Sequence, residues 1–153
     1  MEGKVLAICR STKRGTTKEE IKEGEFEIGY GLKGDAHGGD WHRQISLLGK
    51  ESVDKMQAEI DDFELNFGDF AENITTEGLL LYEIPIGTKL KVGEEVVLEV
   101  TQIGKKCHQD CEIFKKIGKC VMPKEGIFAR VIKGGKAKTG DEIEMISLER
   151  KRS

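Results

Sequence analysis

The chain has 153 residues and a formal net charge of −3, with 37% hydrophobic and 35% charged residues. This balance is typical of a folded protein and excludes a disordered chain, and the length fits a single domain over residues 1–153. The acidic balance gives no general case for nucleic-acid binding, and no apolar stretch approaches the roughly 18 residues of a membrane-spanning helix. We therefore expect a cytoplasmic protein with neither a nucleic-acid nor a membrane partner.

Seven short segments are predicted to be strands, because they are rich in β-branched residues and are bounded by glycine. They cover residues 4–9, 25–28, 44–48, 89–92, 95–102, 127–132 and 142–146. A helix is predicted over residues 50–61, where Val53, Met56 and Ile60 form an apolar stripe, and a shorter one over residues 110–117. Many strands and few helices predict a mainly β fold, and a barrel would hide its strand edges.

Residues 31–43 are rich in glycine and in polar side chains, a composition that suits a binding site. The candidate binding residues here are Gly34, Asp35, His37, Gly39 and Arg43. Glycines let backbone amides approach a ligand and form an anion-binding nest, and Arg43 is suited to grip a phosphate with two hydrogen bonds. His37 and His42 are candidate metal ligands or hydrogen-bonding groups. The alternative is an ordinary surface loop.

A second polar segment covers residues 66–78. Its candidate ligand-binding residues are Glu72, Asn73 and Thr75. These side chains offer hydrogen-bond donors and acceptors for a polar heterocycle. The alternative is that Asn73 and the neighbouring threonines only satisfy the backbone groups of a turn.

Cys107 lies in the most informative segment of the chain. It follows the predicted strand over residues 95–102 and is flanked by Lys106 and His108. Nearby positive charge favours the thiolate, which is both a nucleophile and a soft metal ligand. Residues 103–124 also carry six lysines against two acidic residues, so an anionic ligand would be attracted to this segment.

Three further cysteines and one arginine complete the set of candidates. Cys111 and Cys120 are metal ligands, a redox pair or packing residues, and the sequence leaves these alternatives open. Cys9 lies in an apolar run and is expected to be buried and inert. Arg130 follows an apolar strand start and either lies at the surface or faces a bound anion.

Taken in this order, the motifs resemble the MOSC domain family, which is named after the C-terminal domain of molybdenum-cofactor sulfurases. The resemblance runs from about residue 5 to residue 146, through Gly31-Leu32-x-Gly34-Asp35-x-His37-x-Gly39, residues 43–48, Gly68-x-Phe70-x-Glu72-Asn73-Ile74-Thr75-Thr76-Glu77-Gly78, residues 86–93, residues 98–102, Cys107 and residues 126–131. It implies a mostly β, barrel-like fold and a molybdenum-cofactor site in which Cys107 coordinates the metal. The cofactor-binding residues that it implies are Gly34, Asp35, His37, Gly39, Arg43, Glu72, Asn73, Thr75 and Arg130.

The resemblance also implies an activity, the reduction of small N-hydroxylated compounds with electrons from a separate donor. A second reading is a carrier or accessory module that passes the cofactor, or a persulfide sulfur, to or from cofactor-biosynthesis proteins. No pyridoxal phosphate site is identified in this chain. A zinc-stabilised or thiol-regulated binding domain without a cofactor is a third reading that the cysteines leave open.

Overall fold

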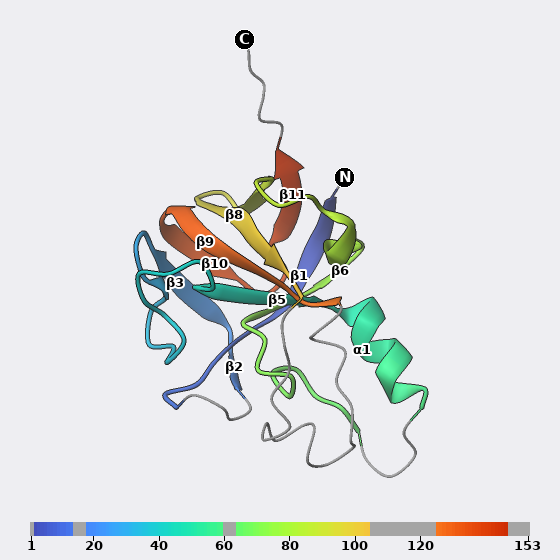
Figure 1. Ribbon diagram of the computed structural model, residues 1–153. Helices are drawn as coiled ribbons and strands as arrows, with labels where there is room; N and C mark the ends of the chain where they lie inside the picture. The colour runs from blue at the N-terminus through green and yellow to red at the C-terminus, as the bar shows by residue number, and fades with distance from the viewer. Residues whose placement is uncertain (1, 14–17, 60–63, 105–124, 147–153) are drawn as a thin grey trace.

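The structure is a computed structural model, and it describes residues 2–13, 18–59, 64–104 and 125–146 (Figure 1). Over these ranges the chain forms eleven strands, one α-helix and one 3-10 helix. In chain order they are β1 (Glu2–Arg10), β2 (Glu19–Ile21), β3 (Glu23–Glu27), β4 (Gly31–Leu32), β5 (Ile45–Gly49), α1 (Lys50–Gln57), β6 (Ile74–Glu77), η1 (Leu81–Glu83), β7 (Lys89–Val92), β8 (Val96–Ile103), β9 (Ile127–Lys133), β10 (Gly135–Lys138) and β11 (Glu142–Ile146). The prediction of a mainly β fold is confirmed. Neither of these helices is long and apolar enough to cross a membrane.

Seven of the strands close into a barrel. Its order is β1, β11, β7, β8, β9, β5 and β6, and β6 pairs with β1 again to complete the ring. Neighbours in the ring are antiparallel except β5 and β6, which run parallel and are joined through α1. Strand β2 adds to β1, and a separate small sheet of β10, β3 and β4 lies beside the barrel, at the left in Figure 1. Because the ring is closed, its seven strands leave no unpaired edge strand, which is the reason for which a barrel was expected.

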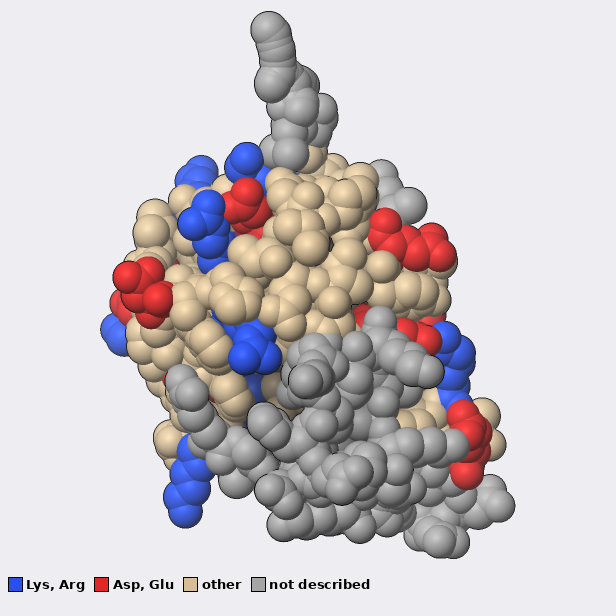
Figure 2. Space-filling view, viewed as in Figure 1, with Lys and Arg blue, Asp and Glu red and all other residues tan. Residues whose placement is uncertain are grey.

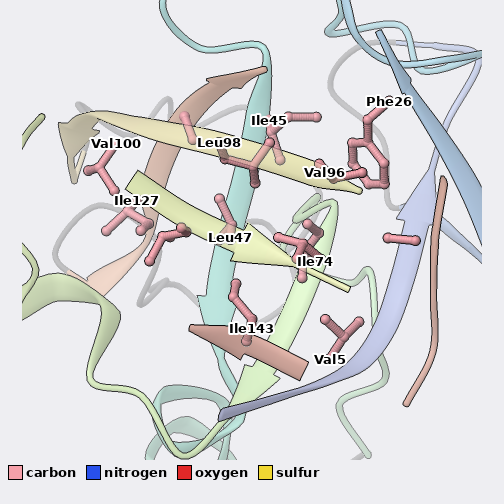
Figure 3. Packing of buried hydrophobic residues seen from close by; sticks show 14 of the residues in the cluster. Val5, Phe26, Ile45, Leu47, Ile74, Val96, Leu98, Val100, Ile127 and Ile143 are labelled. Atoms are coloured by element: carbon pink, nitrogen blue, oxygen red, sulfur yellow. The ribbon is translucent and has the colours of Figure 1, made fainter. Parts of the chain in front are cut away.

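Alternation along the strands separates the core of the barrel from its outer face. In β8, Val96, Leu98 and Val100 are at most 1% exposed and belong to the core, while Glu99 and Thr101 alternate with them and point outward. Figure 3 shows the three core side chains of β8 pointing toward those of the neighbouring strands. Burial of each such side chain stabilises the fold by about 1.5–3 kcal/mol. The outward-facing Glu99 and Thr101 of β8 line the cavity described below.

The helix α1 begins where predicted and ends earlier than predicted. Val53 and Met56 are buried, and the helix packs on β5 and β6. It ends because the Glu59 amide bonds to the Met56 carbonyl three residues back, which tightens the last turn. Part of the predicted continuation lies in residues 60–63, and the whole predicted helix over 110–117 lies in residues 105–124, both outside the described ranges.

Each of the seven segments predicted to be a strand overlaps a strand of the structure. The segments predicted over residues 89–92 and 142–146 match β7 and β11, and a tight turn after Val92 joins β7 to β8 as a hairpin. Gly93 in that turn has a φ of +65°, a left-handed conformation that favours glycine. Four strands were not predicted, namely β2, β4, β6 and β10.

The charged side chains on the face seen in Figure 2 carry both signs and are interspersed with larger uncharged areas. The described residues on this face therefore do not build a broad surface of one charge.

Candidate functional site

A fully buried ion pair organises the glycine-rich loop after β4. The Lys18 Nζ lies 2.7 Å from Asp35 Oδ1, and both side chains are 0% exposed. The same Asp35 oxygen accepts a hydrogen bond from the Ser11 amide at 3.0 Å. Burial lowers the pKa of Lys18 because it disfavours the charged ammonium, and the hydrogen bond to Asp35 opposes this effect. The pair joins β1, the start of β2 and the loop.

His37 is in direct contact with this ion pair. Its Nδ1 lies 3.0 Å from the Lys18 Nζ, and its backbone amide donates to Asp35 Oδ2 at 3.3 Å. Its carbonyl accepts a hydrogen bond from the Trp41 indole at 2.9 Å. His37 is therefore fixed on both sides, by the buried lysine and by the tryptophan that follows in the loop.

Backbone amides in this loop are used by the loop itself. The Gly38 amide donates to the Asp35 carbonyl at 3.1 Å, and the Gly39 amide donates to the Tyr30 carbonyl at 2.7 Å. The Tyr30 hydroxyl donates to the Asp35 carbonyl at 2.7 Å. Gly34 is exposed and has a φ of +87°, which explains the glycine at that position. The Gly38 and Gly39 amides are therefore already engaged within the loop.

Arg43 lies between two aromatic rings just before β5. Its guanidinium carbon is 4.8 Å from the ring centroid of Trp41 and 5.5 Å from that of Phe128, which are cation–π distances. Its Nε atom is buried and has no hydrogen-bond partner among the residues that the structure describes. A buried donor without a partner is costly, so this nitrogen is a candidate contact for a ligand that supplies an acceptor.

A cavity of about 480 Å³ opens on the outer face of β8 and β9, and its lining includes His42 and Gln44, the sequence neighbours of Arg43. Residues that line it include Trp41, His42, Gln44, Ile86, Glu99 and Arg130. The Arg130 Nε and Nη2 both bond to Glu99 Oε1, at 2.7 and 2.6 Å, so the arginine charge is partly neutralised. The volume lies in the range of small-molecule sites, and the lining combines an aromatic ring with a few polar groups.

The strand end that leads to Cys107 is attached beside this cavity. His42 Nε2 lies 2.8 Å from Gln102 Oε1, and the side-chain Nε2 of Gln102 donates to the Gly104 carbonyl at 2.7 Å. The Gly104 amide in turn bonds to the Gly126 carbonyl at 2.7 Å. Cys107, like Cys111 and Cys120, lies outside the described ranges, so its predicted role as a ligand stays a prediction.

Glu72 is buried and its contacts are internal. Its carboxylate accepts hydrogen bonds from the Gly68 amide, the Phe70 amide and the Thr75 hydroxyl, at 3.0, 3.1 and 2.9 Å. Burial raises the pKa of Glu72, and these hydrogen bonds limit the rise. The predicted ligand contacts of Glu72 and Thr75 would therefore have to compete with bonds that already hold this turn together.

Asn73 joins three strands of the barrel. Its Oδ1 accepts from the Ser46 amide at 2.9 Å and from the Ser46 hydroxyl at 3.2 Å, and its Nδ2 donates to the Cys9 carbonyl at 3.1 Å. The side chain is therefore hydrogen-bonded to both β5 and β1, just before β6. The structure agrees with the alternative in which Asn73 satisfies backbone groups.

Cys9 is expected to resist alkylation in the folded protein. Burial, aided by the nearby charge of Glu72, raises the pKa of the Cys9 thiol to about 12, so very little thiolate exists near pH 8. Iodoacetamide at pH 8 should label Cys9 only in urea, as read by peptide mass mapping. Because the unfolded thiol ionises near pH 9, the stability that its burial confers is complete below that pH and is lost as the pH rises toward 12. Rapid labelling of Cys9 under native conditions would contradict the burial.

Lys18 and Trp41 contribute more to this region than the sequence indicated. Trp41 stood within the predicted binding loop, and the structure shows that it supports His37, stacks on Arg43 and lines the cavity. Lys18 carries no local signal, because a single lysine in a charged stretch normally lies in solvent. Among the described residues, no group of three or more histidine, cysteine, aspartate or glutamate side chains is arranged to hold a metal ion.

The molecule is thus a closed β-barrel with a polar, arginine-containing site on its outer face. The model of the MOSC domain matches residues 33–144, well over half of the chain, and the chain belongs to the MOSC domain family. This family is associated with the molybdenum cofactor. No curated protein matches the chain.

Several solved structures have a similar fold. The crystal structure of YuaD from Bacillus subtilis is 19% identical with a TM-score of 0.80, covering 97% of this chain and 98% of that one. YiiM from Escherichia coli is 20% identical with a TM-score of 0.69, covering 99% of this chain and 72% of that one. YiiM from Geobacillus stearothermophilus is 16% identical with a TM-score of 0.72, covering 95% of this chain and 75% of that one. At these identities the likeness shows a shared fold.

Proposed function

We propose that this chain binds the molybdenum cofactor, with the Cys107 thiolate as a ligand of molybdenum, and uses it to reduce N-hydroxylated compounds. The observation that carries the proposal is the buried Arg43 Nε, which has no partner among the described residues. The residues on either side of Arg43 in the sequence, His42 and Gln44, line the cavity. Membership of the MOSC family supplies the identity of the ligand.

The described residues fit such a ligand. The cofactor carries a phosphate and a flat pterin ring, and the site offers two arginines and the indole of Trp41. Arg43 would donate to an anionic or carbonyl oxygen, which would satisfy its unpaired nitrogen. Arg130 would add a second positive charge at the cavity, shared with Glu99. When bound, the cofactor supplies the two-electron redox chemistry, and the protein contributes binding, orientation and electrostatics.

The position of Cys107 in the sequence is compatible with the same site. Three extended residues span at most about 11 Å, and Cys107 follows Gly104 by three positions. The Gly104 carbonyl accepts a hydrogen bond from the Gln102 side chain, which also contacts the cavity residue His42. We therefore expect the thiolate to lie within reach of a ligand in the cavity.

The first test is the molybdenum and pterin content of the protein after expression in a host that makes the cofactor. The wild type is expected to carry about one molybdenum per chain, and Cys107→Ser is expected to lose the metal, because a hydroxyl is a poor ligand for a soft site. Reduction of a hydroxylaminopurine with an artificial electron donor then tests the activity. Wild-type protein that carries neither metal nor pterin would contradict cofactor binding.

A pair of charge-matched variants tests the role of the arginine. Arg43→Gln should lower the pterin content, whereas Lys138→Gln removes an exposed positive charge from β10, away from the cavity, and should leave it unchanged. Equal loss in both variants would mean that overall charge is responsible and not this site. Bound cofactor without any reduction of N-hydroxylated compounds would instead support the carrier reading.

A further inference from the structure

Gln44 offers the cavity a hydrogen-bond donor. The Val131 amide can only donate, so the Gln44 oxygen that lies 2.9 Å from it, Oε1, is committed to β9. The Nε2 atom of the same side chain has no partner among the residues that the structure describes. Gln44 is 3% exposed and lines the cavity, so a ligand there is the partner that Nε2 can still gain.

His42 offers the cavity a hydrogen-bond acceptor. The Gly104 carbonyl can only accept, so the Gln102 atom that bonds to it is Nε2, and Gln102 Oε1 faces the His42 ring at 2.8 Å. Because that oxygen accepts, His42 Nε2 carries the proton, and in a neutral imidazole Nδ1 is then an acceptor. Within the described ranges Nδ1 has no hydrogen-bond partner, and His42 lines the cavity.

Strand β8 holds His42 at two points. The Thr101 hydroxyl donates to the His42 carbonyl, and the Gln102 side chain bonds to the His42 ring. Successive side chains of a regular strand point to opposite faces, but the pairing of β8 with β9 shifts register between Val100 and Gln102. Such a bulge re-aims side chains, which accounts for two neighbouring residues reaching the same histidine. The acceptor nitrogen of His42 is therefore oriented by the barrel wall.

The rest of the lining suits a flat, uncharged ligand. Trp41 and Ile86 give the cavity apolar surface, and the Ile86 side chain is 62% exposed. The charge of Arg130 is paired with Glu99, because two guanidinium nitrogens bond to Glu99 Oε1. The Asp40 carboxylate also lines the cavity but is exposed to solvent. An apolar wall with one neutral donor and one neutral acceptor is typical of a site that fixes the orientation of a small ring.

We propose that Gln44 and His42 recognise the amide edge of a flat heterocycle in this cavity. Gln44 Nε2 donates to the ring carbonyl of the ligand, and His42 Nδ1 accepts from the adjacent ring N–H. Pterins and oxopurines both carry such an edge, so it belongs to the cofactor or to a substrate. The identity of the ring as the cofactor's pterin rests on the proposed function, whereas recognition of the edge does not.

Three probes of one shape test the edge in cofactor-free protein at pH 8. Quinazolin-4-one carries the carbonyl and the N–H, its 3-methyl derivative lacks the N–H, and quinazoline lacks both. Quinazolin-4-one is expected to bind about three- to tenfold more tightly than either of the others, as measured by NMR titration. It should also shift the side-chain Nε2 signals of Gln44, which a Gln44→Met variant assigns. Equal affinity for all three probes would overturn the proposal.

Variants of the exposed His42 assign the acceptor. His42→Asn places an amide oxygen near the Nδ1 position and should keep the preference for quinazolin-4-one over its 3-methyl derivative. His42→Phe keeps a ring without an acceptor and should bind both probes equally. A preference that persists in His42→Phe would refute the role of His42.

Gln44→Glu assigns the donor. It keeps an oxygen for the Val131 amide and replaces the donor by an acceptor, so quinazolin-4-one should bind about tenfold more weakly while quinazoline binds as before. Should this variant not fold, the Gln44 Nε2 signals of the wild type carry the test. Unchanged affinity in the variant, or unshifted Nε2 signals in the wild type, would refute the role of Gln44.

Cofactor-loaded protein distinguishes the two sources of the edge. Loss of quinazolin-4-one binding on loading would assign the edge to the pterin, whereas binding retained on loading would assign it to a substrate. Absence of cofactor from the wild type would overturn the proposed function and leave the probe series in cofactor-free protein as the measure of this inference.

Discussion

Asp35→Ala is expected to lower the free energy of unfolding by about 3–5 kcal/mol, because it leaves the buried Lys18 ammonium without its carboxylate. The Ser11 amide would lose its acceptor at the same time. Urea unfolding at pH 7, followed by circular dichroism, measures this loss. Asp54→Ala is the matched control, since it breaks an ion pair with Lys50 that is 36% and 59% exposed and should cost less than about 0.5 kcal/mol.

A second variant separates the cost of an unpaired charge from the value of the pair. Lys18→Met/Asp35→Leu removes both ions, and it should recover most of the stability that Asp35→Ala loses. If Asp35→Ala were no more costly than Asp54→Ala, Lys18 would have to reach solvent or lose its proton, and the organisation of the loop described above would be wrong.

Asn73→Ala is expected to cost about 2–6 kcal/mol, because it orphans the Ser46 amide and the Cys9 carbonyl at about 1–3 kcal/mol each. Both groups lie inside the barrel wall, where water does not replace the lost partner. Asn66→Ala, an exposed asparagine in the same segment, should change stability by less than about 0.5 kcal/mol. The same urea titration serves for both variants.

The result also bears on whether Asn73 contacts a ligand. A large loss of stability in cofactor-free protein would assign Asn73 to the fold, as the alternative reading of this segment holds. Stability unchanged from the wild type would mean that the hydrogen bonds to Ser46 and Cys9 contribute little. In that case a direct role in cofactor binding would become the better explanation for the asparagine in the motif.

All seven segments predicted to be strands overlap strands of the structure, and the four strands that were missed, β2, β4, β6 and β10, are only two to four residues long. The segment that forms β6 was not predicted to be a strand; it was interpreted as holding the ligand-binding residue Thr75, with a turn as the alternative. In the structure β6 lies between β5 and β1, and its two threonines are 0% exposed. The Thr75 hydroxyl donates to Glu72, three residues earlier, whereas the buried Thr76 hydroxyl has no hydrogen-bond partner among the described residues. Residues 74–77 form a strand because they pair with β5 and β1, which are distant in sequence, and no local pattern encodes that pairing.

The residues of the candidate site could be predicted from the sequence, but their contacts could not. The glycine-rich loop, Arg43 and Arg130 could be found from their residue types, since dense polar and glycine residues are rare outside sites. The partners that give these residues their character are distant in sequence. His37 meets Lys18, Arg43 meets Phe128, and Arg130 meets Glu99 only because the barrel brings their strands and loops together.

The way the barrel closes sets when it can fold during synthesis. Strand β1 pairs with β11, with Glu2, Gly3 and Lys4 opposite Glu144, Ile143 and Glu142. The first strand to be synthesised therefore pairs with the last of the described strands. Until β11 leaves the ribosome, β1 and β7 each keep an unpaired edge, and such edges invite pairing with other chains. Contacts this distant in sequence also form slowly, because a long loop must close before they are made. The nascent chain therefore depends on protection from aggregation until β11 has left the ribosome.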